Sequence, residues 1–157
     1  MAQKFDWESA VRLCDDFLKS ATETDKKKVF ELLGDCCYNL AFQQSTRDEF
    51  KKVIHRAKEA YERVADDKRC KARSGLCKYW LSDDPDERRR ILTDECLTAA
   101  RELVAQIGSS VDAKSLVQAH SELLEYLLLA CKMAFNANAN RIGINIGFHS
   151  FSATFGC

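Results

Sequence analysis

The chain has 157 residues and a formal net charge of zero, because 24 Lys and Arg residues balance 24 Asp and Glu residues. This balance argues against a dedicated nucleic-acid-binding protein, which usually carries a clear surplus of basic residues. A single proline and only six glycines favour long helices, and the length fits one domain with a core of its own.

Apolar residues recur with a helical period along most of the chain. We therefore predict an all-α fold of about six helices. The predicted helices cover about residues 7–20, 26–43, 47–65, 68–81 and 85–107, with a sixth that starts after Ser109 or Asp112 and ends near residue 135.

Residues that stabilise helix N-termini stand where these helices begin. Asp6 precedes the first helix, and its carboxylate can accept hydrogen bonds from the free amides of the first turn. Thr46 and Glu49 form a capping box at the third helix. Asp84 and Pro85 mark the clearest boundary in the chain, because proline is favoured at the first helical position.

The end of the chain differs in kind from the rest. From residue 136 charge nearly vanishes, and apolar residues alternate with period two from Ile142 to Phe148, a strand pattern that has no partner strand. We therefore divide the chain into a helical domain at 1–135 and a tail at 136–157. The tail is predicted to be disordered, strand-like or truncated.

The two stretches 34–40 and 75–81 share the pattern Gly-x-Cys-x-Tyr-x-Leu at an offset of 41 residues (75 − 34). The apolar pattern of the following helix repeats at an offset of 43 (107 − 64). Such periods are typical of helical solenoids, and a recurrent glycine inside a helix indicates a close neighbouring helix. A non-repetitive helical bundle is the alternative. The residues expected at the packing contacts of the repeat are Gly34, Gly75, Tyr38, Tyr79, Ala57 and Ala100.

Eight cysteines are many for this length, but most fall on apolar sides of predicted helices and no apolar leader segment precedes them. We expect buried thiols in a reducing, cytoplasmic environment. Cys70 and Cys77 stand two turns apart on one helix, roughly 10 Å, which is too far to share a zinc ion. The sequence predicts no metal site.

No residue pattern indicates catalysis. His120 and Glu122 flank Ser121, but such close neighbours on one helix do not face each other. The chain has no glycine-rich phosphate loop, and its paired acids stand at helix ends or outer sides. We predict that the protein is not an enzyme and has no catalytic residues and no cofactor.

The repeated segments resemble tetratricopeptide-type (TPR-like) repeats. The first helix of the family's pair is matched by Phe30, Leu33 and Gly34, and the second by Ala57, Tyr61 and Val64. The period of 41–43 exceeds the family's 34 residues, and no proline closes either repeat. The resemblance implies an α-solenoid of antiparallel helical pairs.

The resemblance also implies a scaffold that binds a peptide or partner protein in a groove lined by the first helices of the pairs. The candidate partner-binding residues are Asp35, Asn39, Gln43, Arg73 and Lys78. Solenoids need polar ends, and the last predicted helix is very apolar. We expect a homodimer through 116–135 and the tail, or a longer parent protein, with no nucleic-acid or membrane partner.

The alternative function is a ligand-sensing or regulatory helical domain of a larger signalling protein or enzyme. The two functions differ in what fills the centre of the molecule. A scaffold should have a dry core. A sensor should gather polar groups such as Tyr38, Tyr79, His120 and Glu125 around an internal cavity.

Overall fold

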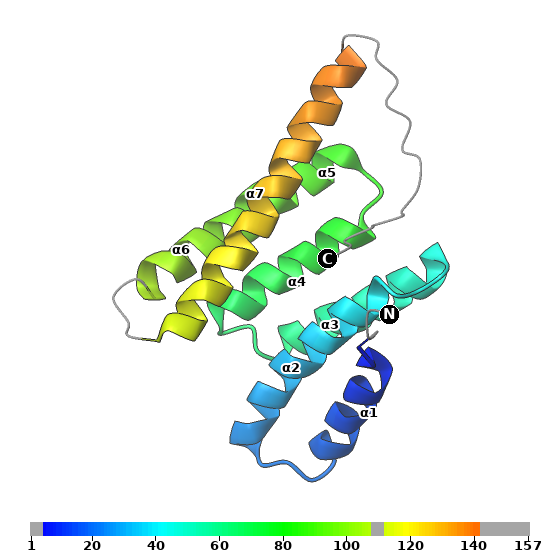
Figure 1. Cartoon of the computed structure of the whole chain (residues 1–157), viewed down its shortest axis with the longest axis vertical. Coiled ribbons are helices and arrows are strands. Elements are labelled where there is room, and N and C mark those ends of the chain that lie inside the picture. Colours follow the sequence, from blue (N-terminus) through cyan, green and yellow to red (C-terminus); the bar gives the residue numbers. More distant parts are fainter. Residues whose placement is uncertain (1–4, 108–111, 142–157) are drawn as a thin grey trace.

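The structure is a computed structural model that describes residues 5–107 and 112–141. Within these ranges the chain is all-helical without β-strands, as predicted, and six helical segments pack against one another (Figure 1). The segments are α1 (Trp7–Leu18), α2 (Glu23–Ala41), α3 (Arg47–Glu62), α4 (Lys68–Leu81), the continuous run of α5 (Pro85–Arg90), η1 (Ile91–Leu97) and α6 (Thr98–Ile107), and α7 (Ala113–Arg141).

Helices α1, α3 and α5 begin at the capping residues that the sequence predicts, whereas α2 begins at Glu23, three residues before its predicted start. The carboxylate of Asp6 accepts from the amide of Ser9 at 3.0 Å. At α3 the predicted N-cap is formed, because the Thr46 hydroxyl oxygen accepts from the Glu49 amide at 3.2 Å. The Thr46 hydroxyl also donates to the Glu49 carboxylate at 3.0 Å, which links the two side chains of the predicted capping box. Each such cap satisfies amides that have no partner inside the helix.

The last helix has its cap at Asp112, whose carboxylate accepts from the amide of Lys114 at 3.1 Å. The other predicted cap, Ser109, lies outside the described residues. Helix α7 continues to Arg141, so the prediction that the helical part ends near residue 135 was wrong. The first six residues of the predicted tail are helical, and the strand pattern that begins at Ile142 lies outside the described residues.

Helices that follow one another in the chain pack side by side, and α7 packs on α6 and η1 (Figure 1). One apolar core runs through all of these contacts. Its largest fully buried side chains include Tyr61, Tyr126, Ile54, Leu76 and Leu92. Burying a side chain of this size contributes roughly 1.5–3 kcal/mol, so the core is the main source of stability.

The two repeated glycines stand at close contacts between helices, as predicted. A Cβ atom added at Gly34 would lie 2.6 Å from the ring of Tyr61 on α3. One added at Gly75 would lie 3.0 Å from the sulfur of Cys96 on η1. Ala57 and the other residues predicted at packing contacts (Gly34, Gly75, Tyr38, Tyr79 and Ala100) are buried.

The second helical pair is not a copy of the first. Its second member runs without a break over 85–107, whereas α3 covers only Arg47–Glu62. Residues Ile91–Leu97 of this run form a π-helical turn, which carries more residues per turn than an α-helix. No sequence signal indicated this turn.

The last helix is very apolar, as the sequence indicates, but much of its apolar surface does not face the core. Val117, Leu124, Leu127 and Leu128 are exposed. The buried residues of α7 are Ala119 and Tyr126. When a helix is apolar on most sides, its sequence does not show which side faces the core, because the helical periodicity of the apolar residues is weak.

Six of the cysteines are buried, as predicted, whereas Cys131 on α7 is exposed. Burial raises the pKa of the thiols of Cys36, Cys70, Cys77 and Cys96 to about 12. A thiol reacts and binds metals as the thiolate, so these buried groups are inert at neutral pH.

Candidate functional site

The predicted groove residues lie on α2 and α4 or just beyond, and they do not form one free surface. Lys78 pairs with Glu95 of η1 at 2.8 Å. The side-chain amide of Asn39 donates to the carbonyl oxygen of Asp35 in its own helix at 2.8 Å. That of Gln43 donates to the carbonyl oxygen of Phe5 at 3.3 Å.

Asp35 belongs to a cluster of charged side chains centred on Arg69, between α2, α4 and α7. The guanidinium of Arg69 donates to Glu31 at 2.7 Å, to Asp35 at 2.9 Å and to Glu122 of α7 at 2.7 Å. The hydroxyl of Tyr61 donates to Asp35 at 2.6 Å. Burial disfavours the charged guanidinium, but the carboxylates of Asp35 and Glu122 outweigh it and raise the pKa of Arg69.

Arg73, one turn further along α4, is buried and has a different set of neighbours. It donates to the carboxylate of Glu125 on α7 at 2.9 Å, and its guanidinium lies 4.2 Å from the centre of the Tyr38 ring. The Tyr38 hydroxyl donates to Glu125 at 2.8 Å and accepts from the indole N–H of Trp80 at 3.1 Å. One acid of α7 thus holds side chains of both α2 and α4.

Two ion pairs link α4 to α7, Arg69 with Glu122 and Arg73 with Glu125. Together they form a ladder of charged side chains. Arg69 and Arg73 are four residues apart, and Glu122 and Glu125 are three apart, so each pair shares one side of its helix. This spacing is visible in the sequence, but no ion pairs were predicted from it. The ladder holds α7 over α2 and α4, the helices of the predicted groove, so α7 occupies part of it.

The contact between α7 and the two helices α2 and α4 is not dry, because charged groups lie between them. Two buried polar atoms in this layer, the Nε of Arg73 and the hydroxyl of Tyr126, have no partner. Of the four polar groups suggested for a sensor, Tyr38 and Glu125 meet here. His120 is exposed and contacts the Leu116 carbonyl oxygen at 2.8 Å instead.

Tyr79, the fourth of these groups, is also elsewhere. The guanidinium of Arg88 lies over the Tyr79 ring, with its central carbon 5.5 Å from the centre of the ring. Tyr38 and Tyr79 thus each carry an arginine over the ring, but only Tyr38 is linked to α7. The match between the two sequence stretches therefore extends to a cation–π contact and not to the ion pairs.

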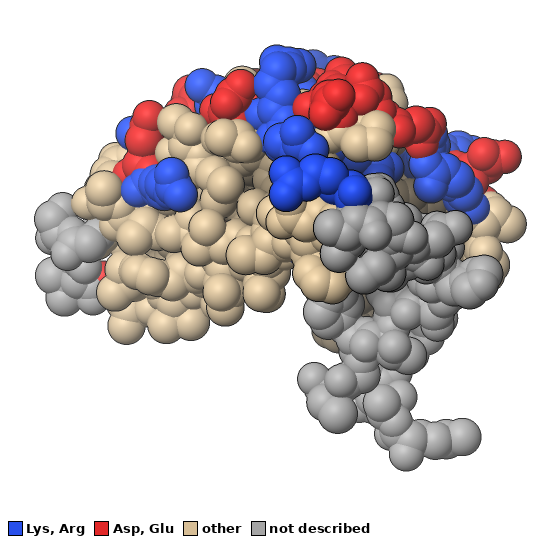
Figure 2. Space-filling view, turned by 90° about the horizontal axis from the view of Figure 1, so that it is seen from above, with Lys and Arg blue, Asp and Glu red and all other residues tan. Residues whose placement is uncertain are grey.

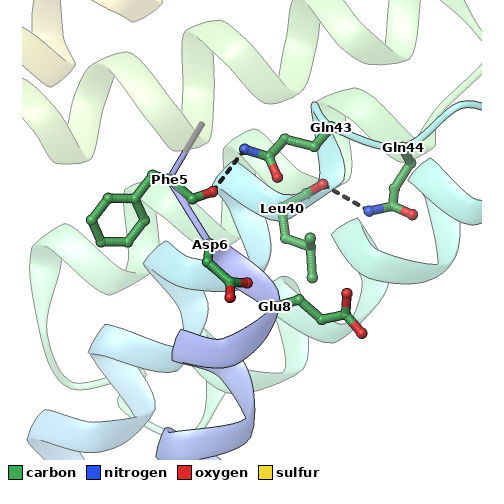
Figure 3. Close-up of a pocket in the computed structure, with 6 residues that line it drawn as sticks. All are labelled: Phe5, Asp6, Glu8, Leu40, Gln43 and Gln44. Carbon is green, nitrogen blue, oxygen red and sulfur yellow. Dashed lines mark hydrogen bonds between the residues drawn. The ribbon is translucent and has the colours of Figure 1, made fainter. Parts of the chain in front are cut away.

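A surface hollow lies where the start of α1 meets the end of α2 (Figure 3). Its lining includes Asp6, Glu8 and Gln43, and the hydrogen bond from Gln43 to Phe5 closes one edge. Asp6 is already used as the cap of α1. The polar side chains of the lining other than Glu8 already bond within the chain, so the hollow carries no argument for a ligand.

Metal ligands do not gather in the described part of the chain, where no cluster of three or more His, Cys, Asp or Glu side chains is placed to hold an ion. None of the helices in that part combines the length and the apolar character needed to cross a membrane.

The outer side of α7 exposes several large apolar side chains to solvent. Its exposed fractions are 66% for Val117, 56% for Leu124, 61% for Leu128 and 64% for Phe135. Seen from above, charged side chains gather along one side of the molecule and leave a broad part of the opposite side without them (Figure 2). Contiguous exposed apolar residues on one helix are typical of a contact surface for another macromolecule.

Comparison with known proteins gives no match to a protein-family model, to a curated protein or to a solved structure. The arguments for function therefore depend on the geometry of this chain alone.

Proposed function

We propose that this chain is a non-catalytic protein–protein interaction module whose contact surface is the outer side of α7. One observation carries the proposal: large apolar side chains, Leu124, Leu128 and Phe135 among them, stand on one side of this helix and are exposed. Leaving such side chains in water is unfavourable, so a partner that covers them gains binding free energy from their burial.

The predicted groove on α2 and α4 remains a secondary proposal. Asp35 and Arg73 are held in ion pairs with other parts of the chain, so a partner would have to compete for them. Lys78 is also held in an ion pair, with Glu95. Asn39 and Gln43 make only neutral hydrogen bonds and would be easier to recruit. A peptide in this groove would lie beside α7.

We also propose that the helical pairs are divergent TPR-like repeats. The equivalent glycines at 34 and 75, each against a residue of the following helix, support a common origin of the two pairs. The greater length of the run over 85–107 argues for divergence. A cytoplasmic location remains a proposal that depends on the buried thiols.

The test is retention of proteins from an extract of the source cells by the immobilised chain. The informative variant combines Leu124→Lys with Leu128→Lys, and the matched control combines Leu13→Lys with Leu32→Lys, which are exposed leucines on α1 and α2. We expect the wild-type chain and the control to retain the same proteins and the α7 variant to lose them. Equal retention by all three would refute a role for α7.

The alternative, a ligand-sensing domain, is favoured by the two unpaired polar atoms on Arg73 and Tyr126. Both are hydrogen-bond donors, so a small ligand that fits there would be an acceptor. The test is a thermal-shift screen with small carboxylates and phosphates. A rise in melting temperature that disappears in Tyr126→Phe would support the sensor.

A further inference from the structure

The exposed residues of α7 follow the spacing of a coiled-coil seam. Positions that alternate three and four residues apart meet a second helix at its a and d positions. On the outer side of α7 these positions are Val117, Ser121, Leu124, Leu128, Cys131 and Phe135. The residues that contact the rest of the chain, such as Ala119 and Tyr126, fall at the remaining positions of the heptad, so no other part of the described chain covers the seam.

The seam is complementary to itself when two copies run antiparallel. A two-fold axis between Leu128 and Cys131 places Leu128 of one copy opposite Cys131 of the second copy. The same axis places Leu124 opposite Phe135, so that a large ring meets a leucine on both sides of the axis. An isologous contact of this kind buries the same residues twice and closes after two copies.

The charges beside the seam also favour the antiparallel arrangement. Glu125 and Lys132 occupy equivalent flanking positions, which face each other across an antiparallel pair. The side chain of Glu125 is 38% exposed although it binds Arg73, so its outer part remains accessible. Each Glu125 would then lie near Lys132 of the second copy, one attractive contact on each side of the axis.

We propose that a second copy of this chain covers the outer side of α7, in an antiparallel pair of α7 helices with its two-fold axis between Leu128 and Cys131. This inference rests on the proposed function and names the partner of the same surface. Apolar layers at the centre and opposite charges at the flanks give the contact its direction, since a parallel pair would not bring Glu125 and Lys132 together.

The first experiment measures the mass of the full chain by sedimentation velocity over a hundredfold range of concentration. We expect a shift from monomer to dimer and no larger species. Leu128→Lys should raise the dissociation constant at least about a hundredfold, because each dimer would bury two lysine charges. Leu13→Lys, at a residue 70% exposed on α1, should leave it unchanged. Circular dichroism of both variants verifies folding.

Three outcomes of this experiment would overturn the inference. A monomer at all concentrations is the first. The second is a mass that grows beyond the dimer and falls with Leu13→Lys, since α1 of one copy would then contact α7 of the next. The third is a dimer unaffected by Leu128→Lys but lost when the chain ends at Arg141, because residues 142–157 would then form the contact.

The second experiment tests the orientation in a Cys157→Ser background. An oxidant should leave Cys131 uncrosslinked there, because it faces Leu128 of the second copy. Adding Leu128→Cys should give a covalent dimer, since the two positions oppose each other within reach of a disulfide. A Cys131–Cys131 crosslink without the added cysteine would indicate a parallel pair and overturn the inference.

The proposed function and the antiparallel pair can be refuted separately. If the chain is a monomer but still retains extract proteins through Leu124 and Leu128, the proposed function stands and the antiparallel pair is refuted. If the chain is a monomer and the α7 variant retains the same proteins as wild type, both are refuted.

Discussion

The two sides of α7 reverse the usual distribution of polar and apolar residues. Its inner side places Glu122 and Glu125 against arginines that are nearly buried, while its outer side exposes Leu124, Leu128 and Phe135. A surface helix normally keeps its charges in water and its leucines in the core. This reversed distribution is not what a helix at the surface of a single soluble chain needs.

The two sides of α7 also depend on different interactions, ion pairs on the inner side and apolar burial on the outer side. Ion pairs with fixed hydrogen-bond geometry set where α7 lies on α2 and α4, but they add little net stability, because burying charges costs about as much as pairing them gains. Apolar residues are not directional, and they contribute only when another surface covers them. Four predictions separate the two sides, from the largest expected effect to the smallest.

Thiol reactivity should differ most. In a Cys157→Ser background at pH 8, we expect Cys131 of the dilute, monomeric chain, which is exposed on the outer side, to react with a thiol reagent at once. The buried thiols whose pKa is raised to about 12, such as Cys36 and Cys96, should react about a thousandfold more slowly, because the thiolate fraction falls tenfold for each pKa unit. A second fast thiol would contradict the burial of these groups.

Glu125→Ala should destabilise the chain by about 2–3 kcal/mol. It removes the carboxylate that pairs with Arg73 and leaves a buried guanidinium without an acid, which is more costly than losing an exposed ion pair. Chemical denaturation followed by circular dichroism gives the free energy of unfolding. Glu125→Gln, which keeps an acceptor, is the matched control and should cost less.

Glu122→Ala should cost about 1 kcal/mol, because Arg69 keeps its bonds to Glu31 and Asp35. The same denaturation measurement applies. The loss of stability should be smaller than for Glu125→Ala, because Arg69 keeps two acids whereas Arg73 loses the acid that it binds. Equal losses for both variants would show that the two arginines are not distinguished by their remaining partners.

Leu124→Gln on the outer side should change the stability of the dilute, monomeric chain by less than about 0.5 kcal/mol, as for most exposed positions. The measurement is thermal unfolding at low and at high concentration. If the outer side is covered in a dimer, the substitution should lower the melting temperature at high concentration only. A large loss in dilute solution would mean that Leu124 packs within the chain.

Much of the fold was predictable, because local signals decide where helices start. Asp6, Thr46 and Asp84 cap their helices as predicted, since a cap depends on a few neighbouring residues. The glycine contacts were also predictable: a glycine kept inside a helix at Gly34 and Gly75 implies a neighbour too close for a Cβ atom.

The ionic layer and the orientation of α7 were not predicted, and the reasons are physical. An ion pair between Arg69 and Glu122 spans 53 residues of sequence, so no local pattern reveals it. Leucines on most sides of α7 remove the contrast that tells the inner side from the outer. The π-helical turn at Ile91–Leu97 depends on how the run packs on α4 and leaves no local signature.

The indole of Trp80 provides a built-in optical probe of α7. It donates to Tyr38, which donates to Glu125 of α7, so release of that helix would change the polarity around the ring. The only other tryptophan, Trp7, starts α1, and Trp7→Phe would leave a single fluorophore. Emission from this one ring would then follow the attachment of α7 in real time, without any added label.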